Sequence, residues 1–228
     1  AGGTGVWLYE GDVSSNGGAI TIVGEGFHYG VQVWDSLVSS GVGDIAVTGT
    51  ATGSDSTGVN VRDGAFASTS GDITITGDAE YGAGIFFGTT GYGPGSSVTT
   101  SSGAISVIST GLSGLNVGDV PFTTDTGSIT LQGTALGDDF GVHVGAGGLS
   151  SNGGDITIIG NSTSSYLGVW INGGDIASNG GDIAISGSST NGAGTQVSGS
   201  DIDSAGGNIS IRGEAPTSTG LIVSSANI

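Results

Sequence analysis

Three acidic residues occupy equivalent positions in the first part of the chain. Glu10, Asp35 and Asp63 each lie three residues before an apolar residue of a short strand motif. If successive repeats stack like parallel strands, the three carboxylates lie about 5 Å apart in one column. Carboxylates at this spacing repel one another unless a cation neutralises them, and hard oxygen ligands favour Ca²⁺. The sequence therefore predicts either a Ca²⁺ site here or, alternatively, three turn residues whose side chains point into water.

Aromatic residues suggest a second surface. Trp7 and Trp170 lie at the outward middle of a strand motif, and Tyr9, Trp34 and Arg62 align two positions further on. We expect such a column to bind sugar or peptide through ring stacking and cation–π contacts. The alternative is lateral packing, against a neighbouring rod or a covering loop, or simple stacking of the side chains on one another along the column.

Catalytic residues are scarce. Polysaccharide cleavage needs paired carboxylates with a base nearby. The chain has no Lys, and neither His28 nor His143 has an acid at a position that aligns with it. P-loop, nucleophile-elbow and zinc-protease motifs are also missing from the sequence. We expect no enzymatic activity and no cofactor other than Ca²⁺.

A repeat of about 27 residues must position these side chains. A Gly-X-aliphatic-X-aliphatic motif has its first aliphatic residue at 20, 45, 73, 105, 129, 156, 183 and 209. A second motif, Gly-aliphatic-X-aliphatic, begins at Gly5 and recurs through to Gly220. Alternation with a period of two residues, bounded by Gly, Ser and Asn, predicts strands.

A third apolar position lies between the two motifs, at 13, 38, 66, 98, 122, 149, 176, 202 and 228. It is seven residues from the motif on either side, except for a six-residue insertion at 88–97 that contains Gly91-Tyr92-Gly93-Pro94-Gly95. Two fixed legs and one variable leg predict a single all-β domain over residues 1–228. Its fold is a right-handed, three-sided parallel β-helix of about eight coils. We expect an uncapped segment of a longer fibre or of one that grows by self-stacking.

The amino-acid composition restricts the classes of partner that the chain can bind. The chain of 228 residues has 50 Gly, no Cys, 20 acidic residues and only two Arg, for a net charge of −18. This charge argues against binding nucleic acid or anionic membranes. No run of 18 apolar residues occurs, so no membrane insertion is expected.

The alternating GVxV and GGDITITG strands, as in Gly58-Val59-Asn60-Val61 and Gly71–Gly77, resemble the β-helix repeats of filamentous-haemagglutinin-like adhesins and large bacterial exoproteins. The resemblance extends over the whole chain. It implies an extracellular, non-enzymatic structural or adhesive rod, a segment or subunit of a bacterial cell-surface fibre. Its expected partners are copies of itself end to end or side by side, flanking repeats of the same chain, and glycans or host surfaces.

Two alternative functions remain open on sequence alone. One is a β-helix protein that binds or degrades polysaccharide. The other is an ice-binding solenoid, because small and hydroxyl residues fill the outward centre of the first motif. They are Thr21, Ala46, Thr74, Ser106, Thr130, Thr157, Ala184 and Ser210.

Overall fold

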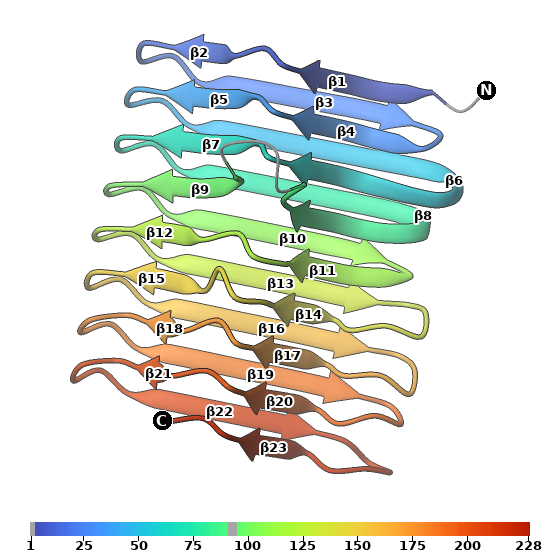
Figure 1. Ribbon diagram of the computed structural model, residues 1–228, viewed down its shortest axis with the longest axis vertical. Helices are drawn as coiled ribbons and strands as arrows, with labels where there is room; N and C mark the ends of the chain where they lie inside the picture. Colours follow the sequence, from blue (N-terminus) through green and yellow to red (C-terminus); the bar gives the residue numbers. More distant parts are fainter. Residues whose placement is uncertain (1–2, 91–94) are drawn as a thin grey trace.

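The segments in which apolar and polar residues alternate form strands throughout the described residues. These strands stack as a parallel β-solenoid of about eight turns (Figure 1). The structure is a computed structural model that describes residues 3–90 and 95–228. Among these residues there is no helix long and apolar enough to cross a membrane.

Each turn has three legs. The long leg carries the Gly-X-aliphatic-X-aliphatic motif, the middle leg carries the Gly-aliphatic-X-aliphatic motif, and the short leg carries the third apolar position. The long leg consists of β3 (Ile20–Gly26), the first part of β6 (Ile45–Arg62), the first part of β8 (Ile73–Gly88), β10 (Ile105–Gly111), β13 (Ile129–Ala135), β16 (Ile156–Ser162), β19 (Ile183–Ser189) and β22 (Ile209–Glu214).

The other two legs run back across the solenoid in the opposite direction (Figure 1). The middle leg consists of β1 (Thr4–Tyr9), β4 (Tyr29–Trp34), the ends of β6 and β8, β11 (Ser113–Val117), β14 (Val142–Val144), β17 (Val169–Asn172), β20 (Thr195–Ser198) and β23 (Leu221–Ser224). The short leg consists of β2 (Val13–Ser15), β5 (Leu37–Ser40), β7 (Ala65–Ser68), β9 (Ser97–Thr100), β12 (Phe122–Thr124), β15 (Leu149–Ser151), β18 (Ile176–Ala177) and β21 (Ile202–Asp203).

The predicted columns are confirmed. Ile20, Ile45 and Ile73 pair in register, and the same column continues to Ile209. The middle-leg column from Val6 to Leu221 is also in register, as is the short-leg column from Val13 to Ile202. Most of these side chains are fully buried and form one continuous apolar core, which is the main stabilising term of a stacked repeat.

A hydroxyl closes the corner between the short and long legs, where the chain reverses; it is buried at Thr124 and Ser151 and half-buried at Ser68. The Ser68 hydroxyl accepts the backbone N–H of Gly71 at 2.9 Å, and the Ser151 hydroxyl accepts that of Gly154 at 2.8 Å. Thr124 does the same for Gly127. Because these groups are shielded from water, the hydroxyl supplies hydrogen bonds that the turning backbone loses.

One coil has a longer connection between its middle leg and its short leg, the coil that contains β8 and β9. β8 ends at Gly88 and β9 begins at Ser97, whereas two residues, Asp63 and Gly64, separate the equivalent strands of the preceding coil. Residues 91–94 of the expected insertion lie outside the described part of the chain.

Candidate functional site

The acidic column forms, but as a row of corner residues. Glu10, Asp35 and Asp63 have positive φ angles of 48°, 46° and 50°, and their backbone N–H groups donate to carbonyls of the next coil. Asp tolerates this left-handed conformation better than most residues. This geometry confirms that the three are turn residues, but the side chain of Asp63 is buried and does not point into water.

The three carboxylates do not gather into a coordination shell. Asp63 is only 2% exposed, and its carboxylate accepts hydrogen bonds from the backbone N–H and the hydroxyl of Thr90. Within residues 3–90 and 95–228, no three His, Cys, Asp or Glu side chains are spaced to hold a metal ion. Asp63 closes the turn after β8 through these bonds, and Ca²⁺ binding at this column stays a prediction.

Aspartates at equivalent positions of successive coils have a structural role. Asp155 Oδ1 accepts the backbone N–H of Asp182 at 2.8 Å, and Asp182 Oδ1 accepts that of Asn208 at 2.7 Å. The same bond joins Asp44 to Asp72 and Asp175 to Asp201. Each carboxylate thus binds the backbone of the following coil, so the repulsion between neighbouring acids is offset by charge-assisted hydrogen bonds.

Aromatic residues at the first coils form an exposed group, here called the N-terminal aromatic cluster, of Trp7, Tyr9 and Trp34. The ring centroids of Trp7 and Tyr9 are 5.3 Å apart, and those of Tyr9 and Trp34 are 6.3 Å apart. A hydrogen bond with Glu10, followed by the charge of that residue, raises the pKa of Tyr9. The predicted alignment of Tyr9, Trp34 and Arg62 is confirmed by the strand register.

Arg62 lies beside this cluster but faces a different ring. Its guanidinium carbon is 4.9 Å from the ring centroid of Phe86 on the next coil. This geometry is that of a cation–π contact. Since Phe86 already occupies one face of the guanidinium, Arg62 helps to hold its own coil against the next one.

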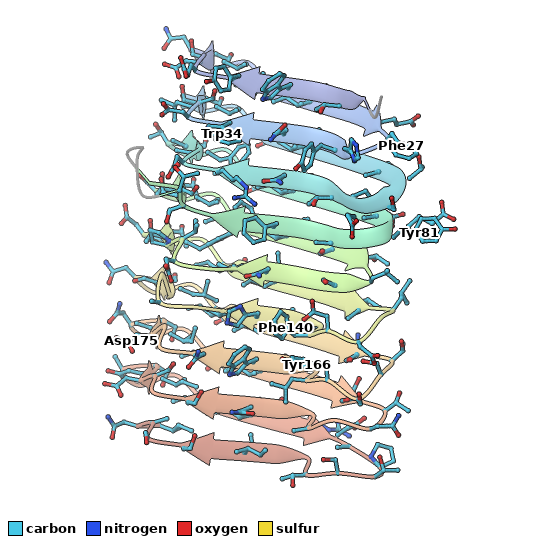
Figure 2. All side chains as sticks on the ribbon, turned by 45° about the vertical axis from the view of Figure 1, so that its right-hand side comes forward. Phe27, Trp34, Tyr81, Phe140, Tyr166 and Asp175 are labelled. Atoms are coloured by element: carbon cyan, nitrogen blue, oxygen red, sulfur yellow. The ribbon has the colours of Figure 1, made fainter. Side chains whose placement is uncertain are left out.

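A second group of rings, here called the ring cluster, lies on the middle leg at β14 and β17. It consists of Phe140, His143, Tyr166 and Trp170. His143 and Trp170 stack with centroids 4.6 Å apart and planes 28° apart. Phe140 lies 5.0–5.5 Å from each of the other three rings, and Figure 2 shows Phe140 and Tyr166 on the same outer face.

Two polar atoms of the ring cluster are buried without a hydrogen-bond partner: Nε2 of His143 and Nε1 of Trp170. The other imidazole nitrogen, Nδ1, pairs with Oδ1 of Asn116 at 3.2 Å. Burial lowers the pKa of His143, against smaller opposing effects of the charges of Asp139 and Asp119. The imidazole is therefore held in its neutral form by its surroundings.

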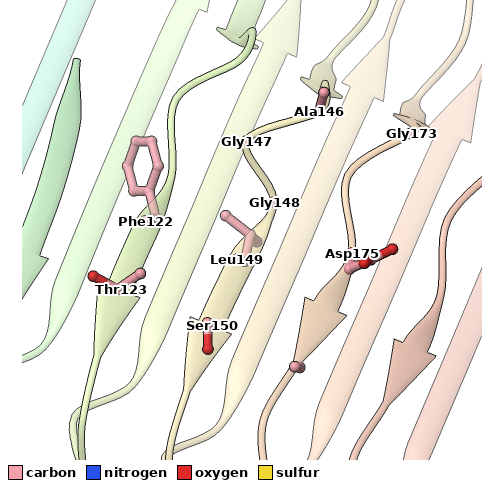
Figure 3. A pocket seen from close by; sticks show the side chains of 10 residues that line it. Phe122, Thr123, Ala146, Gly147, Gly148, Leu149, Ser150, Gly173 and Asp175 are labelled. Atoms are coloured by element: carbon pink, nitrogen blue, oxygen red, sulfur yellow. The ribbon is translucent and has the colours of Figure 1, made fainter. Parts of the chain in front are cut away.

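A shallow depression of about 340 Å³ adjoins the ring cluster. Tyr166, Trp170, Ser165, Leu167 and Gln196 line it. Another depression, of about 310 Å³, lies beside the short leg between Phe122 and Asp175 (Figure 3). Its one ionisable group, Asp175, already accepts a hydrogen bond from the backbone of Asp201. Two aromatic side chains line the depression at the rings, and one of them, Trp170, carries a buried Nε1 without a hydrogen-bond partner.

Sequence reasoning placed Trp170 correctly but missed Phe140 and Tyr166. Both lie on the connections from the long leg to the middle leg, whose lengths vary, so they have no fixed spacing from the first motif. Counting backward from the following glycine gives the missing signal. Phe140 precedes Gly141 directly, and Tyr166 lies two residues before Gly168.

The outward small-residue column of the long leg is also formed, with Thr21, Ala46 and Thr74 in register and Thr157 and Ala184 further along. The adjacent column contains Val23, Thr48, Thr76, Ile108, Gln132, Ile159, Ser186 and Arg212. Aliphatic, amide and charged side chains in this column break any regular hydroxyl lattice.

No known protein family, curated protein or solved structure is significantly similar to this chain.

Proposed function

We propose that the chain is a non-enzymatic extracellular rod, a structural and adhesive segment or subunit of a bacterial cell-surface fibre. The observation that carries the proposal is the unbroken stack of parallel coils around one apolar core. A stack of this kind extends by adding coils, because each coil contacts only its neighbours. The resemblance of its repeats to those of filamentous-haemagglutinin-like exoproteins also supports the proposal.

The proposed partners lie along the axis of the stack and are flanking repeats of the same chain or a second copy. Each coil pairs with its neighbours through parallel strands, so a further coil would continue the same ladders and the same apolar core.

Localisation at the cell surface gives the most direct test. Antibodies raised against the purified rod are expected to label intact cells of the source, and gold labelling in electron microscopy should follow thin fibres. Labelling that requires permeabilised cells would contradict the proposal. Sedimentation of the purified chain over a range of concentrations then separates self-stacking, which gives growing species, from covalent continuation, which leaves a monomer.

Among the alternatives, polysaccharide binding has a specific observation in its favour, the ring cluster. Ice binding is less well supported, because the outward columns of the long leg lack a regular hydroxyl pattern, and we expect no thermal hysteresis. Cleavage of polysaccharide is also less well supported, because His143 pairs with the amide of Asn116 and has no carboxylate hydrogen-bonded to either nitrogen.

A further inference from the structure

The ring cluster has unsatisfied hydrogen-bonding capacity of both kinds. If Nδ1 of His143 donates to Oδ1 of Asn116, then Nε2 is a bare acceptor. The indole Nε1 of Trp170 is a donor, and neither atom has a partner. A buried polar atom without a partner destabilises a protein, so two such atoms on a pair of stacked rings call for an explanation.

A hydroxyl group fits this pair, because one hydroxyl accepts a hydrogen bond and donates another. It could accept from the Trp170 indole and donate to the His143 imidazole, whose rings are stacked 4.6 Å apart. The surrounding surface is apolar, formed by the faces of Phe140 and Tyr166. The matching ligand therefore has hydroxyl groups at its edge and an apolar face, which is the chemistry of a sugar ring.

The negative charge of the chain favours a neutral sugar over an acidic one. The chain carries a net charge of −18, and Asp139 and Asp119 lie close enough to His143 to influence its pKa. These carboxylates would repel a uronic acid or a sulfated sugar. At the rim of the depression, Gln196 and Ser165 offer neutral donors and acceptors for further hydroxyl groups.

We propose that the ring cluster binds a neutral pyranose unit of a polysaccharide, with Trp170 and His143 sharing a sugar hydroxyl. The unpaired atoms are covered in the free protein, so a ring must turn to admit the ligand. Tyr166 is suited to this movement, because it is 43% exposed and lies on the connection between β16 and β17. The proposal rests on the adhesive part of the proposed function and assigns it a site and a ligand class.

The N-terminal aromatic cluster supplies the internal control. Trp7 and Tyr9 are 58% and 51% exposed, so their rings are open to solvent. Neither ring has a buried polar atom without a partner, in contrast to Trp170 and His143. If exposed aromatic area alone decided binding, this cluster would bind sugar at least as well as the ring cluster.

The test is a titration of the ¹⁵N-labelled full chain with cellohexaose and maltohexaose, followed by NMR through the three Trp indole N–H signals. The Trp170 signal is expected to shift with at least one of these neutral oligosaccharides, while those of Trp7 and Trp34 stay in place. Tyr166→Ala is expected to weaken binding by about two- to tenfold through lost ring contact. Trp170→Phe keeps a ring but removes the donor, and should weaken binding by a similar factor.

Tyr9→Ala is the matched control and should leave binding unchanged. The proposal is overturned if neither oligosaccharide at millimolar concentration shifts the Trp170 signal, if Tyr9→Ala weakens binding as much as Tyr166→Ala, or if oligogalacturonate binds more tightly than the neutral sugars. Gln196→Ala, at the rim, keeps all four rings and should also weaken binding of the neutral oligosaccharide; unchanged binding would exclude the rim from the site. Surface labelling of cells is measured separately, so a rod that labels but binds no sugar refutes the site and leaves the proposed function standing.

Discussion

Replacing Gly160 by Ala should destabilise the solenoid sharply, although the same change in an unstrained strand usually has the opposite effect. A Cβ atom added at Gly160 would lie 2.1 Å from the carbonyl oxygen of Gly168, where ordinary contact begins near 3.4 Å. Here the long and middle legs of one coil meet backbone to backbone. The Gly168 oxygen also accepts the backbone N–H of Val142 from the neighbouring coil at 2.9 Å.

The new methyl group must therefore move a backbone segment by more than 1 Å and strain a ladder hydrogen bond. Overpacking together with a weakened hydrogen bond should lower the free energy of unfolding by about 2–4 kcal/mol. For a chain of this size that loss corresponds to a fall in Tm of about 4–16 °C. Without the clash, Gly→Ala would raise stability by about 0.4–1 kcal/mol by restricting the unfolded chain. The sign of the change thus tests the argument.

Ser109 provides the control, because it occupies the same column in the coil of β10, between Gly77 and Gly133. In that coil the legs leave room for a side chain, and the Ser109 hydroxyl donates to the carbonyl of Gly114 at 2.7 Å. Ser109→Ala should lower the free energy of unfolding by only about 0.5–1.5 kcal/mol. Urea unfolding followed by circular dichroism measures both variants. A neutral or stabilising Gly160→Ala would refute the reasoning, as would equal losses in the two.

Four further variants and one ligand test address the core, the corners, the imidazole and the acidic column. Phe122→Ala should lower the free energy of unfolding by about 3–5 kcal/mol, measured by urea unfolding, because the ring is fully buried. Asp182→Ala should increase hydrogen exchange at the backbone amide of Asn208, whereas Asp182→Asn, which keeps an acceptor oxygen, should protect it. Since burial lowers the pKa of His143, stability should fall as pH drops below about 6.5 towards that lowered pKa. His143→Gln should flatten this part of the stability profile. Changing from chelator to millimolar Ca²⁺ should leave Tm unmoved, because no three carboxylates gather in the described part of the chain.

The sequence predicted the core closely, because strand alternation and two seven-residue legs leave one register that buries every aliphatic column. Ile73, for example, could be aligned with Ile45 and Ile105 by counting alone. The roles of the acids could not be decided in this way. Spacing places Asp155 next to Asp182 but does not say whether the carboxylates bind a cation, water or backbone N–H groups. That choice depends on the local backbone direction at the corner, which residue spacing does not specify.

The ring cluster shows a second limit of prediction from sequence, which concerns residues on connections of variable length. His143 and Trp170 follow from strand register, whereas Phe140 and Tyr166 come from connections of variable length, and their contacts depend on how each connection folds. Beneath the rings, the inward Val142 and Val144 keep the same core pattern as every other coil. Since the shaft is held by inward side chains and by bonds between coils, an outward face can acquire binding groups without loss of the fold. A coil can therefore carry different groups on its outer surface while it still pairs with the next coil, and the proposed adhesive rod requires this separation of shaft and surface.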